Sequence, residues 1–149
     1  MNKKTSFQRN IRLVSNLWTY TIEEVFDFIK TGCNWSMDIR NETKRIQAIS
    51  DHDLQNDLKN QLLPYCCFNG TFSYRCESGL IEYSKYTSID YDGLDDATMN
   101  KVKQWLMQQP CVKFFYVSPS GHGLKVIVEH TNTNPKKHRG RRSWKNCTK

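Results

Sequence analysis

The sequence of 149 residues lacks three features that would place it among membrane, secreted or zinc-binding proteins. It contains no apolar run near the roughly 20 residues that a transmembrane helix requires. Its first ten residues, MNKKTSFQRN, are too polar for a signal peptide. The six cysteines include no CxxC pair, and Cys66 and Cys67 are adjacent, which is not the spacing of a zinc site. We therefore expect a cytoplasmic protein with reduced cysteines and no membrane partner.

Acidic side chains are absent from residues 133–149, and this absence explains the charge of the chain. The formal net charge is +7, the segment holds seven Lys and Arg residues, and the remaining 132 residues balance 15 basic against 15 acidic side chains. A basic tail binds polyanions by charge, but it does not make its domain recognise a specific nucleic-acid sequence. We expect one folded domain over residues 1–132 and a disordered basic tail over 133–149.

Hydrophobic residues make up 38% and aromatic residues 12% of the chain, which suits a globular fold. Residues 19–32 predict a helix, because Thr21 and Glu24 form a capping box and Gly32 provides a stop. Residues 38–62 have apolar side chains at helical spacing and predict one or two amphipathic helices. The first half of the chain is thus expected to be largely helical.

The second half of the chain is predicted to form mainly strands. Residues 65–75 and 80–92 are rich in aromatic and β-branched side chains, and residues 112–130 show two apolar runs around a Pro-Ser-Gly-His-Gly turn. Between them, residues 93–110 predict a helix that begins at an aspartate cap and ends at a proline. This order predicts an α+β fold with a mainly antiparallel sheet covered by helices.

Two carboxylates stand one residue apart in SIDYDG, residues 88–93. On a strand, residues i and i+2 share a face, so Asp90 and Asp92 project together. Paired carboxylates suit Mg²⁺ or Mn²⁺, which prefer oxygen ligands and keep positions open for substrate phosphates. The alternative is a solvated strand end without a ligand, since a D-x-D pattern alone is weak evidence for a metal site.

A second polar group lies in VSPSGHGLK, residues 117–125. Ser120, His122 and Lys125 supply a hydroxyl, an imidazole and an ammonium, and the two glycines allow the backbone to approach a ligand. Together they form a donor-rich cradle for phosphate oxygens. The alternative is an ordinary hairpin turn that uses Pro, Ser and Gly for their turn chemistry. The two groups complement each other as parts of one nucleotide site.

The combination of DYD after a strand with SGH in a later hairpin resembles the motifs of the archaeo-eukaryotic primase, or primase-polymerase, superfamily. More closely, the chain resembles the primase-like N-terminal domain found ahead of VirE-type helicase regions in proteins of bacterial mobile elements. The resemblance covers roughly residues 5–135, and the segments that carry it are SFQRNIR, TIEEVFDFIKTG, LPYCCFNGTFSYR, GLIEYSKYTSIDYDGLDD and FFYVSPSGHGLKVIVEH.

This resemblance implies an RRM-like, primase-like core and a nucleotidyltransferase activity in DNA replication. It implies that Asp90 and Asp92 bind Mg²⁺ or Mn²⁺, that Ser120 and His122 contact the phosphates of a nucleoside triphosphate, and that His122 joins the two acids in catalysis. It also implies a basic residue near the site, for which Arg75 is the candidate. The implied partners are a single-stranded DNA template and a helicase domain or protein.

The sequence departs from the superfamily in its third motif, a further metal-binding acid. The only acid after His122 is Glu129, so the chain resembles a primase domain truncated before that motif, and enzymatic activity stays open. The alternative function is a non-catalytic module that binds nucleotide or nucleic acid. A nicking replication initiator is a third interpretation, but His122 and His130 are too far apart for its His-hydrophobic-His pair.

Overall fold

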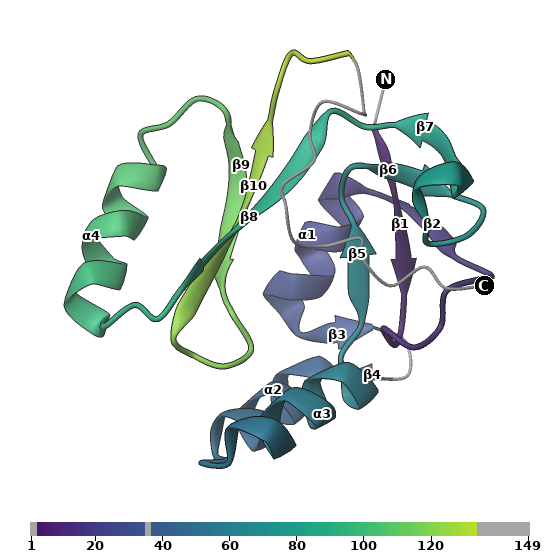
Figure 1. The fold of residues 1–149 in the computed structure, drawn as a ribbon. Coiled ribbons are helices and arrows are strands. Elements are labelled where there is room, and N and C mark those ends of the chain that lie inside the picture. The colour runs from purple at the N-terminus through teal and green to yellow at the C-terminus, as the bar shows by residue number, and fades with distance from the viewer. Residues whose placement is uncertain (1–2, 35–36, 134–149) are drawn as a thin grey trace.

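The computed structural model describes residues 3–34 and 37–133 and shows an α+β fold, as the sequence predicts (Figure 1). All strand pairs in these residues are antiparallel. The core is thus compatible with an RRM-like arrangement. The expected tail over 133–149 lies outside the described residues, apart from Thr133. The helices are α1 (Ile22–Thr31), α2 (Ile39–Gln47), α3 (His52–Leu62) and α4 (Asp96–Leu106).

Each helix begins at a side chain that accepts a backbone N–H, which explains where the helices start. Thr21 and Glu24 form the predicted capping box of α1, and α1 ends at Gly32 with φ +68°. Asp95 caps α4 by accepting from the N–H of Thr98. The helical region over residues 38–62 forms two helices, α2 and α3, each with an aspartate cap. None of the helices in the described part of the chain is long and apolar enough to cross a membrane.

The strands do not form the single sheet that the sequence suggests. One sheet has the order β2-β1-β5 and another the order β8-β10-β9, while β3 pairs with β4 and β6 pairs with β7. A short 3₁₀ helix, Glu77–Gly79, precedes β7. The strands are β1 (Lys4–Gln8), β2 (Trp18–Thr21), β3 (Cys33–Asn34), β4 (Met37–Asp38), β5 (Tyr65–Cys67), β6 (Gly70–Phe72), β7 (Leu80–Tyr83), β8 (Tyr86–Asp92), β9 (Val112–Val117) and β10 (Gly123–Glu129).

The predicted strand over residues 80–92 divides into β7 and β8 because the backbone turns at Lys85. Lys85 has φ +66°, a left-handed conformation that a continuing strand does not adopt. The buried hydroxyl of Ser84 holds this turn by donating to the carbonyl of Phe68 and accepting from the N–H of Tyr86. As a result, β7 pairs with β6 and β8 joins the other sheet.

The β8-β10-β9 sheet carries the candidate site, and its two faces have different surroundings. On one face, α4 packs against β10 through Met99, Leu106, Leu124 and Val126, which are all buried. Figure 1 shows α4 on the outer side of this sheet, with α1 on the other side between the two large sheets. The sheet is therefore held between α4 and the rest of the molecule.

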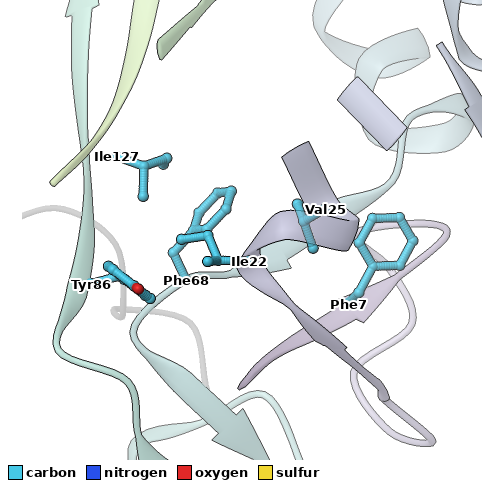
Figure 2. Close-up of a cluster of buried hydrophobic side chains, with 6 residues drawn as sticks. All are labelled: Phe7, Ile22, Val25, Phe68, Tyr86 and Ile127. Atoms are coloured by element: carbon cyan, nitrogen blue, oxygen red, sulfur yellow. The ribbon is translucent and has the colours of Figure 1, made fainter. Parts of the chain in front are cut away.

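The face of this sheet that looks toward α1 is apolar over one part and polar over the other. A buried cluster joins it to α1 and to the β1 and β5 region (Figure 2), and its members are Phe7, Ile22, Val25, Phe68, Tyr86 and Ile127. Asp90 and Lys125 lie farther along the same face, because they are an even number of residues from Tyr86 and Ile127. The polar end of this face is where the sequence places its site.

Candidate functional site

Asp90 and Asp92 lie on the same face of β8, each opposite a residue of β10. The register pairs Asp90 with Lys125 and Asp92 with Gly123. Lys125 Nζ donates to Asp90 Oδ2 at 2.8 Å, and Ser88 Oγ donates to Asp90 Oδ1 at 3.3 Å. Both aspartates are exposed, so solvent or a ligand can reach them. The structure therefore brings together both predicted acids and the predicted lysine.

Gly123 allows the Asp92 carboxylate to reach the hairpin. A β carbon at Gly123 would lie 2.4 Å from the carbonyl oxygen of Tyr91, which is closer than real contacts allow. The same β carbon would lie 3.2 Å from Ser118 Oγ and 3.3 Å from Asp92 Oδ1. The space above Gly123 is thus shared by a hydroxyl and a carboxylate, and only glycine leaves it open.

The tip of the β9-β10 hairpin is a tight turn that gathers two serine hydroxyls. The N–H of Gly121 donates to the carbonyl of Ser118 at 2.9 Å, and Pro119 occupies the turn position that favours its fixed φ. The N–H of Ser118 donates to the carbonyl of Gly123 at 2.8 Å, which closes the loop. Ser118 Oγ and Ser120 Oγ are 2.9 Å apart. Ser120 is therefore linked through Ser118 to the space beside Asp92.

The backbone of His122 is fixed by a hydrogen bond, while its side chain is exposed. Its carbonyl accepts from the N–H of Leu94 at 2.9 Å, which ties the hairpin tip to the connection between β8 and α4. The position of the imidazole relative to the two acids is not fixed by any hydrogen bond within the described residues. The structure thus places His122 at the same end of the sheet as the two acids, and within the described residues no hydrogen bond joins its ring to Asp90 or Asp92.

Tyr116 on β9 lies directly opposite Lys125, so its side chain is on the same face of the sheet as the two acids. Burial raises the pKa of the Tyr116 phenol well above its ordinary value, and Cys66 and Asp90 raise it further. Burial likewise raises the pKa of the Cys66 thiol. Both groups are therefore uncharged at neutral pH, so neither adds a negative charge to those of the two acids.

Two helical residues near the site were missed by sequence reasoning, Gln47 on α2 and Lys59 on α3. The Gln47 side chain approaches the hairpin tip, since its Nε2 would be 3.7 Å from a β carbon on Gly121. Burial lowers the pKa of Lys59, Lys125 lowers it further, and Asp92 acts in the opposite direction. Neither residue belongs to a motif, and only the packing of α2 and α3 brings them to the hairpin.

Two other residues considered from the sequence lie in different surroundings. The Arg75 guanidinium lies over the Tyr65 ring at 4.7 Å, beside β5 of the other large sheet. Glu129 is paired with Lys3 and Lys113 at the far end of β10. It is four residues from Lys125 along the strand, a separation of about 13 Å at the usual strand rise. The structure therefore does not add Glu129 to the two acids.

The site fits a metal ion that arrives with phosphates better than a metal held by protein alone. In the described part of the chain, no group of three or more His, Cys, Asp or Glu side chains is arranged to hold a metal ion. Mg²⁺ is commonly bound through one or two carboxylates together with water and substrate phosphates. Exposed Asp90 and Asp92, beside hydroxyls and an ammonium, match that second pattern.

A family model described as the BT4734-like, N-terminal domain matches residues 57–148. Neither the curated proteins nor the solved structures gave a match. The family match corrects the assignment made by resemblance, because nothing in it indicates a VirE-type or primase-polymerase domain. That assignment depended on the DYD and SGH motifs and on the resemblance of five segments over roughly residues 5–135, and a resemblance of separate segments does not by itself identify a family. The matched range includes β8, the β9-β10 hairpin and the basic segment up to residue 148.

Proposed function

Since the chain belongs to the BT4734-like, N-terminal domain family, whose pattern spans the whole β8-β10 edge, we propose that this edge binds a nucleoside triphosphate together with Mg²⁺ or Mn²⁺. The observation that carries the proposal is the register of β8 against β10. It sets Asp90 opposite Lys125 and Asp92 opposite Gly123. Two carboxylates, an ammonium and the open space above Gly123 therefore lie within two cross-strand pairs.

Asp90 and Asp92 would hold the metal ion, which screens the charge of the phosphates from the two carboxylates. Lys125 engages Asp90 in the structure and would exchange that carboxylate for a phosphate oxygen when metal binds. Ser118 and Ser120 offer hydroxyl donors, and the glycines on either side of His122 let the phosphate chain approach the backbone. Lys125 and the two serines thus have partners in the structure and would have phosphate partners in the complex.

Binding, rather than catalysis, is the function that the described residues support. Nucleotidyl transfer by a two-metal mechanism places both the attacking and the leaving oxygen on metal ions. Two carboxylates give few ligands for two ions, and Glu129 lies at the other end of β10. Transfer of a nucleotide to a 3′-hydroxyl on a single-stranded DNA template is a further activity that the same site would serve, and primer extension tests it directly.

The cysteines suit a reducing compartment, where a nucleotide-binding protein of this kind would work. Among the described residues, Cys66, Cys67 and Cys111 are free. Burial raises the pKa of Cys67 to about 11, so its thiol resists oxidation at neutral pH. These features support a cytoplasmic location as part of the proposal.

Isothermal titration of ATP in the presence of Mn²⁺ tests the proposal. We expect wild-type protein to bind ATP only with the metal, and we expect Asp90→Asn and Asp92→Asn each to weaken binding about tenfold or more, because each removes a charged ligand. Glu82→Gln is the matched control, since Glu82 is an exposed strand carboxylate on β7. Wild-type protein that is folded but does not bind Mn²⁺ with ATP would overturn the proposal.

A further inference from the structure

The α2 and α3 helices form a hairpin that lies beneath the tip of the β9-β10 hairpin (Figure 1). Gln47, the last residue of α2, makes the approach. Its Nε2, Cδ and Cγ atoms would lie 3.7, 3.8 and 3.9 Å from a β carbon placed on Gly121. These are ordinary contact distances, so the Gln47 amide already lies beside the turn that carries Ser120.

Lys59 belongs to the last turn of α3, directly before the chain enters β5. The carbonyl of Lys59 accepts from the N–H of Leu63 at 3.2 Å, so this turn is fixed to the buried start of the next segment. The side chain is half-buried. One turn earlier on the same face of α3, Gln55 Nε2 donates to the carbonyl of Ile46, the residue before Gln47, so Lys59 lies on the face of α3 that is turned toward α2.

Each of the two acids acts on a lysine before any ligand enters. Asp90 pairs with Lys125. Burial and the charge of Lys125 lower the pKa of Lys59, and the charge of Asp92 raises it. When a metal ion neutralises the carboxylates, both ammonium groups lose their counter-charges and gain the ability to pair with an anion. A phosphate chain is an anion with several acceptor oxygens and can engage both lysines at once.

We infer that the α2-α3 hairpin is the second wall of this site, with the Lys59 ammonium and the Gln47 amide donating to the phosphate chain that the metal ion brings in. This inference rests on the proposed function and adds two binding residues to it. It also gives the ligand a direction: the phosphates lie between the β9-β10 tip and α3, and the nucleoside extends away from them.

Titration of two probes separates the role of Lys59 from that of the two acids. Mn²⁺ with ATP and Mn²⁺ with inorganic tripolyphosphate are each titrated into wild type, Lys59→Met and Gln47→Ala. We expect Lys59→Met to weaken both probes by about tenfold and by similar factors, and Gln47→Ala to weaken both by about threefold, because a charged donor contributes more than a neutral one. Lys59→Arg keeps the charge and is expected to retain most of the affinity.

The controls are Lys101→Met and Gln104→Ala, two exposed residues of α4 on the opposite side of the sheet. Circular dichroism of every variant shows whether it is folded. Unchanged affinity in folded Lys59→Met, with wild type binding both probes, would overturn this inference and leave the proposed function standing. Weaker ATP with unchanged tripolyphosphate would also overturn it, because Lys59 would then contact the nucleoside. No binding by wild type would instead overturn the proposed function itself.

Discussion

Asp90 and Lys125 are directly opposite each other on β8 and β10, and their side chains form an ion pair of 2.8 Å. The pair is partly exposed, with 48% of the Asp90 side chain and 32% of the Lys125 side chain accessible. Exposed pairs of this kind contribute little to stability. The pair therefore leaves Asp90 available to exchange an ammonium for a metal ion at low cost.

Lys125→Met is expected to change metal binding and nucleotide binding in opposite directions. Without the ammonium, Asp90 no longer has a competing cation, so Mn²⁺ alone should bind several-fold more tightly. The phosphates lose a charged donor, so ATP with Mn²⁺ should bind about tenfold more weakly. Titrations of the metal with and without ATP measure both effects. Weakening of both by the same factor would instead indicate that the substitution disturbs the β8-β10 edge as a whole.

Gly123→Ala is expected to destabilise the fold and disturb the site at once. The new methyl group would lie 2.4 Å from the Tyr91 carbonyl oxygen and 3.3 Å from Asp92 Oδ1, so β8 and β10 must separate. Overpacking of this kind costs about 1 to 3 kcal/mol. Urea unfolding measures the cost. Gly93→Ala is the comparison, because a β carbon there meets no atom within 4 Å and only the positive φ of +67° opposes it, for about 1 kcal/mol.

The sequence predicted the elements with local signals and missed those fixed by tertiary contacts. The capping box at Thr21 and the glycine stop at Gly32 lie within one segment, so α1 was found with its ends. The β1 strand was missed because its sequence, KTSFQ, is polar. Thr5, Ser6 and Gln8 are nonetheless buried. Their burial is possible because Ser6 Oγ accepts from the N–H of Phe72 and Gln8 Nε2 donates to the carbonyls of Ser15 and Asn16.

The same distinction applies to the site. Asp90 and Asp92 could be paired from the strand period alone, and the hairpin turn aligned Lys125 with them. Lys59 could not be predicted, because its place depends on how α3 packs beneath the hairpin. The family was not inferred correctly from the two motifs and the five segments over residues 5–135, because the local chemistry and strand patterns that they share with another family also occur in unrelated folds.

Glu129 is expected to make folding stability depend on pH in acid. Hydrogen bonds from Lys113 and then Lys3 lower the pKa of Glu129 to about 2 from an ordinary value of 4.5. A depressed pKa contributes stability that is complete above the unfolded-state value and is lost as the pH falls toward the folded-state value. The difference in urea midpoint between wild type and Glu129→Gln should therefore be largest near neutral pH and shrink between about pH 4.5 and pH 2. A constant difference over that interval would contradict this account.

Leu124→Ala is expected to be among the costly substitutions in the sheet. Leu124 is fully buried between β10 and α4, and its truncation leaves a cavity there, at a cost of about 2 to 5 kcal/mol. Trp105→Ala on α4 provides the contrast, because Trp105 is 54% exposed and surface substitutions change stability by about 0.5 kcal/mol or less. Thermal unfolding of the two variants measures both. Equal losses would mean that α4 packs on the sheet through a different face.

The central claim is that Asp90 and Asp92 hold a metal ion together with nucleotide phosphates, and paramagnetic broadening of backbone amide signals by Mn²⁺ tests it most directly. With ATP present, substoichiometric Mn²⁺ is predicted to broaden the signals of residues 90–92 and 118–125 before those of β1 and β2. The broadening should disappear in the Asp90→Asn/Asp92→Asn double variant. Broadening that is centred elsewhere on the molecule, or that persists in the double variant, would contradict the claim.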